Sequence, residues 1–263
     1  MQLKKERIPF TIFEKERPGG LLRYARRVDN LLGHKGRTGR ELVEKMVSHA
    51  EEMGVEIIKK EITSVKRSKG GFEISTADSR FFTSNLVLAT GSIPRHIDVR
   101  GILYRVEWEL DLKGNSVLII GGGDLALDNA LRCRDTGADV TVLHRSVLKA
   151  NRGLIEEAAN SGIVFTKGNA DDIRFEGDVF IMKDNAEFDI AAAFIGRNPE
   201  RSLLGEMENV EYKLPSHSTT VNGLYLIGDA ASVANSQAAY ALSSGIACAM
   251  DIARRVRNDE SGP

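Results

Sequence analysis

The stretch NSVLIIGGGDLALDNALRCRDTGADVTVLHRS, residues 115–146, decides the fold of this chain. It opens on an apolar run at 117–120, which leads directly into three consecutive glycines. Apolar residues at helical spacing follow as far as Gly137, and a second apolar run ends at His144. A strand, a glycine turn, a helix and a second strand in this order predict a parallel βαβ unit.

The glycine turn itself predicts nucleotide binding. Gly121, Gly123 and Ala126 fit the pattern G-x-G-x-x-A, placed between a strand and an amphipathic helix. The first glycine permits the tight turn, and the second lets a diphosphate approach the backbone. The small third residue lets the helix pack closely on the strand, and the phosphates lie at the positive end of that helix.

The residues after the second strand favour NADP over NAD. An NAD site places an acidic residue about 20 residues after the glycines, on the ribose hydroxyl. This chain has His144, Arg145 and Ser146 there, followed by Lys149 and Arg152. A guanidinium can hold a 2′-phosphate with paired hydrogen bonds, whereas a carboxylate would repel it. The alternative is that these basic residues form an ordinary solvated edge.

One order of elements occurs twice along the chain. A helix, a strand, a hairpin and an apolar strand ending in glycine are expected over 40–91 and again over 154–196. The two stretches are not similar residue by residue, but the shared order indicates two copies of one α/β unit.

The first 20 residues are expected to be part of the first copy. Residues 1–7 are predicted as the end of a helix and residues 8–13 as a buried strand, with Glu14 directly after it. In a dinucleotide-binding unit such an acid lies about 20 residues beyond the glycines. The 13 residues before Glu14 contain no glycine, so we expect the phosphate-binding turn of this copy to be missing. The loss of a central parallel strand would leave its neighbours with unpaired backbone groups.

Composition excludes several classes of protein. The 263 residues are 42% hydrophobic and 28% charged, with a net charge of −1, which gives no reason to expect nucleic acid or an anionic membrane as a partner. No apolar run approaches the roughly 20 residues that span a bilayer. No signal-peptide pattern opens the chain, so a cytoplasmic protein is expected.

The cysteines and most histidines are expected to be structural. Cys133 and Cys248 are too few for a disulfide framework and form no C-x-x-C motif, so both are predicted to be small buried side chains. No metal site is predicted. Four histidines stand without a paired partner and are expected at the surface or in capping positions: His34, His49, His96 and His217.

Seven motifs together resemble the thioredoxin reductase-like branch of the two-dinucleotide-binding-domain flavoproteins. The resemblance extends over essentially the whole chain. It implies an α/β fold of two Rossmann-like three-layer domains, with an NAD(P)-binding domain at 101–199 inserted into a split FAD-binding domain at 1–100 and 200–263. The motifs are FEKERPGG (13–20), ATGSIPR (89–95), IIGGGDLA (119–126), HRS (144–146), FIGRNPE (194–200), GLYLIGDAA (223–231) and SQAAYALSSGIACA (236–249).

The resemblance also implies a role for particular residues. Glu14 would bind the adenosine ribose of FAD, and Asp229 would bond to its ribityl or diphosphate region. Gln237 and Ala238, at a helix N-terminus, would face the end of the flavin that becomes negative on reduction. The remaining FAD-binding residues would be Gly19, Gly20, Thr90, Gly91 and Gly228, and the NADP-binding residues would be Gly121, Gly123, Asp124, Ala126, His144, Arg145, Lys149 and Arg152.

One departure from the family concerns its redox-active disulfide. The place where a C-x-x-C would stand falls in LYRVEWEL (103–110), where Tyr104 and Glu107 replace the cysteines. Neither side chain can exchange disulfides, so thioredoxin reduction by the usual route is not expected.

The resemblance then implies an FAD-dependent NAD(P)H oxidoreductase, similar to ferredoxin–NADP reductases. It would be a homodimer that passes electrons between NADPH and ferredoxin or another acceptor, although no catalytic residue can be named. Two alternatives remain open. The chain could be an NADP-binding protein that has lost FAD, or a part that needs a partner chain to complete its FAD site.

Overall fold

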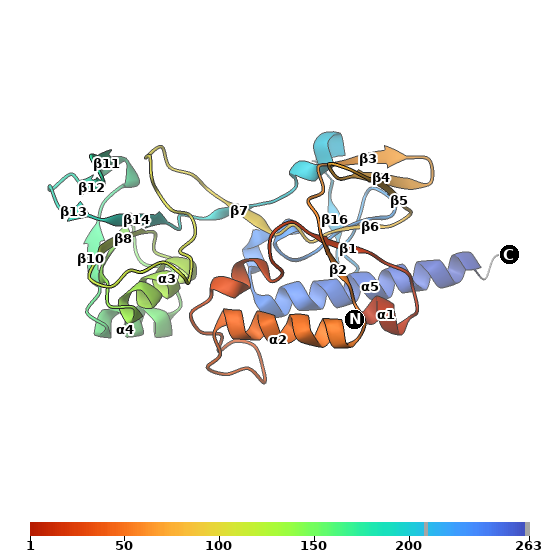
Figure 1. The fold of residues 1–263 in the computed structure, drawn as a ribbon, viewed down its shortest axis with the longest axis horizontal. Helices are drawn as coiled ribbons and strands as arrows, with labels where there is room; N and C mark the ends of the chain where they lie inside the picture. Colours follow the sequence, from red (N-terminus) through yellow and green to blue (C-terminus); the bar gives the residue numbers. More distant parts are fainter. Residues whose placement is uncertain (208–209, 261–263) are drawn as a thin grey trace. The chain divides into compact units, whose positions relative to one another are not determined.

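The computed structural model describes residues 1–207 and 210–260, and the chain forms two compact units (Figure 1). Unit 1 comprises Met1–Gly20, Val43–Ile93 and Asn198–Pro263, and unit 2 comprises Leu21–Leu42 and Pro94–Arg197. The chain passes from one unit to the other at both ends of Leu21–Leu42, and again in two short strands that pair with each other, β7 (Ser92–Pro94) and β15 (Arg197–Pro199).

Unit 2 is built on a four-stranded parallel sheet in the order β10-β9-β8-β14. Residues 115–146 form β8, the helix α3 and β9, so the predicted βαβ unit is confirmed. The elements of this unit are β8 (Ser116–Ile120), α3 (Asp124–Asp135), β9 (Asp139–His144), α4 (Arg152–Asn160), β10 (Val164–Lys167), β11 (Ile173–Glu176), β12 (Val179–Met182), β13 (Glu187–Phe188) and β14 (Ile190–Ala193), with a 3₁₀ turn at Ala170–Asp172.

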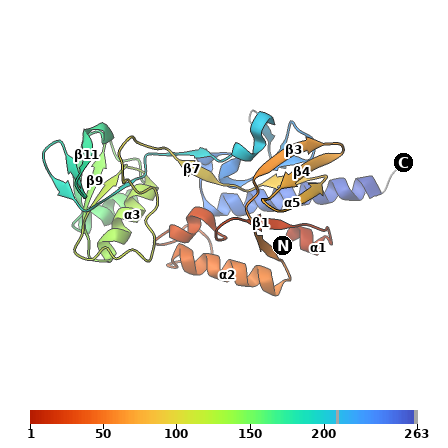
Figure 2. The ribbon, with the colours of Figure 1, turned by 45° about the horizontal axis from the view of Figure 1, so that its top comes forward.

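Strand β8 is buried on both faces, as its unbroken apolar sequence requires. Val117 and Ile119 pack in one cluster with Ala126 and Leu127 of α3. Leu118 and Ile120 point the other way, into a cluster that includes side chains of the antiparallel sheet β11-β12-β13. The unit therefore has three layers, with helices on one face of the parallel sheet and a small antiparallel sheet on the other (Figure 2).

The segment Leu21–Leu42 joins unit 2 through charges on the outer side of α3 and α4. The backbone N–H of Arg26 donates to Asp128 at 2.9 Å, and its guanidinium pairs with Glu157 at 2.8 Å and with Asp135. Burial raises the pKa of Asp128, although the hydrogen bond and charge of Arg26 act against that shift.

Unit 1 repeats the same order of elements in a less continuous form. The elements before Pro94 are α1 (Gln2–Lys5), β1 (Ile12–Glu14), α2 (Gly39–Glu52), β2 (Ile57–Lys59), β3 (Ser64–Ser68), β4 (Gly71–Ser75), β5 (Arg80–Thr83) and β6 (Leu86–Leu88). Helix α2 belongs to unit 1 from Val43 onward, and a 3₁₀ turn at Gly20–Tyr24 leads from unit 1 into the segment Leu21–Leu42 of unit 2. Those after it are β16 (Tyr212–Lys213), β17 (Ser218–Thr219), β18 (Leu224–Leu226) and α5 (Ala238–Glu260), with 3₁₀ turns η3 (Ser202–Met207), η4 (Gly228–Ala230) and η5 (Val233–Asn235).

Three sheets make up unit 1. Strands β1 and β2 form a parallel pair, and β3, β4 and β5 form an antiparallel sheet. The third sheet has the order β16-β17-β18-β6, in which β18 and β6 are parallel. The main core of unit 1 lies between the antiparallel sheet and the strands β6 and β18. In a smaller cluster, Tyr225 packs with Cys248 and Ile252 of α5 and with Leu3 of α1.

Most of the expected elements are confirmed, but the first strand is not as predicted. Helix α1 confirms the end of a helix within residues 1–7, and α2 and α4 confirm the two helices that open the repeated order. The buried strand predicted at 8–13 is wrong, because only Ile12–Glu14 is a strand and Ile12 is 38% exposed. Among the residues that the structure describes, β1 is hydrogen-bonded to a neighbouring strand on one side alone, so its apolar sequence does not lead to burial.

Both cysteines are buried, as predicted. Burial raises the pKa of the Cys133 thiol to about 11 and that of the Cys248 thiol to about 12. Cys133 lies on α3 in unit 2 and Cys248 on α5 in unit 1, each among apolar side chains. Both are therefore uncharged, structural thiols near neutral pH. No helix of the described part of the chain is long and apolar enough to cross a membrane.

His217 corrects the expectation that the histidines are superficial. It is 3% exposed, its ring stacks on Tyr212 with a centroid distance of 5.8 Å, and it meets Tyr240 edge-on at 5.9 Å. Its Nδ1 lies 3.2 Å from the carbonyl oxygen of Leu226. Burial lowers the pKa of His217, since the apolar surroundings disfavour the imidazolium.

The buried histidine predicts a pH-dependent stability of unit 1. A histidine with a folded-state pKa below its ordinary value of 6.5 contributes stability above pH 6.5 and loses it as the pH falls through the folded-state pKa. His217→Asn removes this titration, and asparagine tolerates the left-handed backbone found there (φ 58°). We expect the melting temperature of the unmodified chain to fall more between pH 8 and pH 5 than that of the variant, measured by thermal denaturation. Equal falls would contradict the assignment.

Candidate functional site

The carboxyl end of β8 carries a turn that accepts only glycine at its first position. Gly121 has φ +139°, and a Cβ built on it would lie 2.4 Å from the carbonyl oxygen of Phe194. The N–H of Phe194 in turn donates to Ile120 at 2.7 Å, so the end of β8 and the residue after β14 are held together at this point. The first glycine of the G-x-G-x-x-A pattern is therefore required by a close approach of two backbones.

The second glycine leaves open space at the start of α3. Gly123 is the N-cap residue, with φ −99° and ψ 179°, and no side chain caps the helix there. No heavy atom lies within 4 Å of the position that a Cβ would take. The helix thus presents N–H groups and the positive end of its dipole to an accessible place, as a phosphate-binding turn does. Ala126, the third small residue, is fully buried against β8.

The loop that follows β9 is tied to the glycine turn by main-chain hydrogen bonds. The carbonyl oxygen of Gly122 accepts from the N–H of Lys149 at 2.7 Å and from that of Ala150 at 3.1 Å. A carboxylate oxygen of Asp124 accepts from the backbone of Asn151 at 2.7 Å. The geometry thus brings this loop to the start of α3, a connection that the sequence pattern did not reveal.

The basic side chains of this loop are exposed. His144 ends β9, and its Nδ1 lies 2.6 Å from the carbonyl oxygen of Ser146. Arg145, Lys149 and Arg152 have exposed side chains on the same short stretch. The local structure therefore places three cationic groups within a few residues of the hydrogen bonds to the glycine turn.

In unit 1, several of the expected residues meet at the carboxyl ends of β6 and β18. Ser92 donates to Asp229 at 3.0 Å. Thr90 donates its hydroxyl to the carbonyl oxygen of Glu200 at 2.5 Å, and the N–H of Glu200 donates to Gly91 at 2.9 Å. Thr90, Gly91 and Asp229 thus lie where the two parallel strands end, the usual edge for ligands in such sheets.

The start of α5 packs against the same place. Gly228 has φ +56°, and a Cβ on it would meet the Cβ of Ala241 at 3.4 Å. The hydroxyl of Ser244 accepts from the N–H of Gly228 at 3.0 Å. Gln237 and Ala238 open this helix, so they belong to the same region as Asp229.

Glu14 lies on the other parallel pair of unit 1, and Gly19 and Gly20 lie in the turn that follows β1. Glu14 ends β1, and its carboxylate accepts from the N–H of Glu16 at 2.9 Å. Gly19 has φ +103°, and a Cβ there would lie 2.4 Å from the side chain of Val43 on α2. Gly20, with φ +49°, faces open space. The candidate FAD residues are therefore divided between two sheets of the unit.

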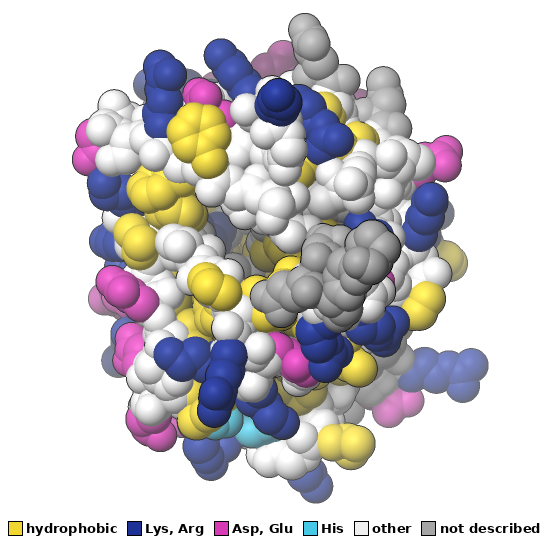
Figure 3. All heavy atoms as spheres, turned by 90° about the vertical axis from the view of Figure 1, so that its right-hand side faces the viewer, with side chains coloured by type: hydrophobic (Ala, Val, Ile, Leu, Met, Phe, Trp, Pro, Cys, Tyr) yellow, Lys and Arg dark blue, Asp and Glu magenta, His cyan; other side chains and the backbone are white. Residues whose placement is uncertain are grey.

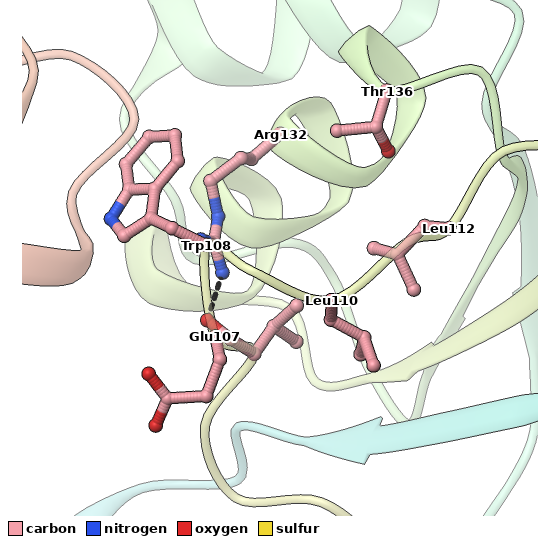
Figure 4. Close-up of a pocket in the computed structure, with 7 residues that line it drawn as sticks. Glu107, Trp108, Leu110, Leu112, Arg132 and Thr136 are labelled. Carbon is pink, nitrogen blue, oxygen red and sulfur yellow. Dashed lines mark hydrogen bonds between the residues drawn. The ribbon is translucent and has the colours of Figure 1, made fainter.

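The segment 103–110, where the resemblance would place a C-x-x-C, is held on α3 by a buried arginine. Arg132 donates to the carbonyl oxygen of Val106 and, at 3.1 Å, to Asn129, while its guanidinium carbon lies 4.6 Å from the centre of the Trp108 ring (Figure 4). Burial lowers the pKa of Arg132. This contact was missed from the sequence, because an arginine within a helix is typically a surface residue.

The two residues that replace the cysteines have ordinary structural partners. The hydroxyl of Tyr104 accepts from the N–H of Ile97 at 2.9 Å, and its ring lies 4.3 Å from that of His96. Glu107 pairs with Arg105 at 2.6 Å. The described residues of this segment therefore form no thiol pair, as the two buried cysteines already indicated.

Comparisons with known proteins agree with this fold. The thioredoxin reductase of Lactococcus lactis superposes with a TM-score of 0.86 and 23% identity, covering 97% of this chain and 93% of that one. The thioredoxin reductase of Chlamydia trachomatis is 24% identical over 91% of this chain and 87% of its own length. A ferredoxin–NADP reductase of Streptococcus pyogenes is 33% identical over 41% of this chain and 37% of its own length.

The fold class is α/β, and it matches the thioredoxin reductase structures, which have two dinucleotide-binding domains. The profile of the pyridine nucleotide-disulphide oxidoreductases matches residues 31–163. The chain belongs to this family, in its thioredoxin reductase-like branch, and the resemblance inferred from the seven motifs is confirmed. Flavin-dependent NAD(P)H oxidoreductases make up the family.

The two outer glycines of the turn predict effects on stability of very different size. Gly121→Ala forces a side chain onto the Phe194 carbonyl at an unfavourable φ, so we expect a loss of about 2–3 kcal/mol in the free energy of unfolding. Gly123→Ala meets no atom and has an allowed φ, and since alanine is a poorer N-cap than glycine it should cost at most about 1 kcal/mol. Urea denaturation of both variants tests this, and a Gly123→Ala loss as large as that of Gly121→Ala would contradict it.

Proposed function

We propose that this chain is an FAD-dependent NAD(P)H oxidoreductase that works without a redox-active disulfide. It would pass electrons from NADPH through the flavin to an acceptor such as ferredoxin or another redox protein. The observation that carries the proposal is the open glycine turn at the start of α3, with three exposed cationic residues on the loop tied to it. The thioredoxin reductase and ferredoxin–NADP reductase relatives support it.

The residues of unit 2 fit NADP. The diphosphate would approach the N–H groups beside Gly123, where no side chain occupies the space. Arg145 would hold the 2′-phosphate, with His144, Lys149 and Arg152 around it. Asp124 would act indirectly, because its carboxylate is engaged with Asn151 and so orients the loop. On this proposal residues 101–199 form the NAD(P)-binding domain.

The residues of unit 1 fit part of an FAD site. Asp229, Thr90 and Gly91 lie at the carboxyl ends of β6 and β18, and Gln237 and Ala238 open α5 beside them. Glu14 would bind the ribose, and Gly19 and Gly20 would let the backbone approach the flavin. On this proposal residues 1–100 and 200–263 form the FAD-binding domain, and the protein is a homodimer.

On this proposal no cysteine thiol takes part in the reaction. Bound nicotinamide and flavin supply hydride transfer, and the chain's own residues bind and orient these groups. Cys133 and Cys248 are buried with raised pKa values, and Tyr104 and Glu107 are held by structural contacts. Electrons would therefore leave the flavin directly for the acceptor.

The cofactor preference depends on the charge at Arg145. Arg145→Ala should weaken NADPH binding about tenfold or more and NADH binding much less, since only NADPH has the 2′-phosphate. Arg100→Ala, which removes an exposed arginine of unit 2 outside the loop, is the matched control and should change neither. The measurement is fluorescence titration with both nucleotides, and equal weakening of the two would refute the preference.

Purification of the chain with its cofactors tests the function as a whole. The expected result is a yellow protein whose flavin absorbance is bleached by NADPH without oxygen, and Gly123→Ala should abolish the bleaching because its methyl group occupies the phosphate space. A colourless protein that still binds NADPH would reject the flavoenzyme and favour an NADP-binding protein without FAD. Flavin binding that appears only with a partner chain would favour the remaining alternative.

A further inference from the structure

Arg132 of α3 is a buried cation that stacks on an aromatic ring. Lysine and arginine side chains ordinarily lie at the surface, as one face of the molecule shows (Figure 3). Arg132 is 4% exposed, and its guanidinium lies against the ring of Trp108, whose indole N–H donates to the carbonyl oxygen of Arg23 at 2.9 Å. The aromatic face attracts the cation but offers no hydrogen-bond acceptor in the plane of the guanidinium.

The hydrogen bonding of this guanidinium is incomplete. Its Nη2 donates to the carbonyl oxygen of Val106 and, at 3.1 Å, to Asn129. Its Nε is buried and has no hydrogen-bond partner among the residues that the structure describes. The carboxylates of Asp128 and Glu107 attract the charge from a distance, without a hydrogen bond to it. A buried cation with an unused donor is costly unless a negative group completes its surroundings.

A small pocket lies beside the guanidinium (Figure 4). Arg132 and Trp108 line it together with Thr136, one turn further along α3, and with Leu110 and Leu112. Its volume of about 10 Å³ is close to the smallest that holds one water-sized body. Leu110 is 37% exposed, so an ion can enter from solvent at that side. The pocket thus combines a cationic donor with a mainly apolar wall.

The negative groups around the pocket are turned away or already bonded. The carboxylate of Glu107 pairs with Arg105 at 2.6 Å, and in Figure 4 it points away from Arg132. At the end of α3 the carbonyl oxygen of Cys133 accepts from the hydroxyl of Thr136 at 2.7 Å. The positive charge of Arg132 is therefore the strongest electrostatic influence on a body in the pocket.

We propose that this pocket binds one monovalent anion of halide size, with chloride as its ligand in solution. The anion accepts a hydrogen bond from Nε of Arg132 and neutralises the buried charge. It thereby strengthens the contact between α3 and the segment 103–110, which the same arginine holds through Val106 and Trp108. The site lies within unit 2 and is independent of the proposed binding of flavin and NADP.

Charge decides this occupant over a water molecule or a larger anion. Water fits by size but brings no charge to the buried guanidinium, which stays protonated in proteins. Sulfate and phosphate carry a second charge and several oxygens that must be hydrated or bonded, and the leucines of the wall offer no donors for them. A weakly hydrated monovalent anion loses least on entering such a pocket.

The fluorescence of Trp108 reads the site directly, because it is the only tryptophan of the chain. Bromide quenches an indole that it touches, and it is titrated at constant ionic strength against gluconate, which is too large for the pocket. We expect quenching that saturates, with a midpoint on the order of 10 mM. Chloride at about 0.1 M should raise that midpoint about tenfold, and sulfate at equal ionic strength should leave it unchanged.

Two variants assign the anion to Arg132. Arg132→Met keeps an unbranched side chain of similar length but removes the charge and the donor, so the saturating part of the quenching should disappear and a linear, collisional part should remain. Lys113→Met is the matched control, since it removes an exposed cation beside the pocket residue Leu112. This variant should keep both the saturation and the competition by chloride.

Other outcomes would overturn the proposal. Linear quenching in the unmodified chain would show that bromide only collides with the ring and that the pocket holds solvent. Competition by sulfate as strong as that by chloride would show general screening, and saturation that persists in Arg132→Met would place the anion elsewhere. If Arg132→Met does not fold, the chloride and sulfate titrations of the unmodified chain still decide between a site and screening. Because the signal is the relative change in tryptophan fluorescence, a failure here is distinct from a failure of the proposed oxidoreductase.

Discussion

The hydrogen bonding of a central parallel strand on both sides is the constraint on which this structure depends. Strand β8 donates and accepts along β9 on one side and β14 on the other, and its four buried side chains divide between two core clusters. The glycine turn at its end, the position of α3 and the loop after β9 all follow from this one strand. The described residues of unit 1 include no such strand, and there the parallel strands form two separate sheets and β1 is partly exposed.

Much of the fold could be predicted from the sequence because its signals are local. The run VLII, the glycines and the helical spacing up to Gly137 all lie within one βαβ unit, and the structure has that unit. Residues 8–13 misled the prediction because apolar composition indicates burial only when both neighbouring strands are present. Whether that stretch is buried depends on which strands pair with it in the sheet, and the local sequence does not contain this information.

The contacts that hold the site together could not be predicted, because they join residues far apart in the sequence. Nothing in the pattern around Arg132 indicates that it would be buried under Trp108, or that Asp124 would bind the backbone of Asn151. His217 is similar, since its burial depends on Tyr240 at the start of α5. Local residue type predicts which groups are available, and tertiary contacts decide which of them meet.

The main-chain bonds from Gly122 to Lys149 and Ala150 have an evolutionary consequence. They fix the path of the loop through backbone atoms, so the loop keeps its position whatever side chains it carries. Residues such as Arg145 can then be exchanged for acidic or neutral ones without disturbing the turn beside them. If the loop binds a nucleotide as proposed, single substitutions in it would alter the selectivity between related nucleotides, while the main-chain bonds keep the loop in position.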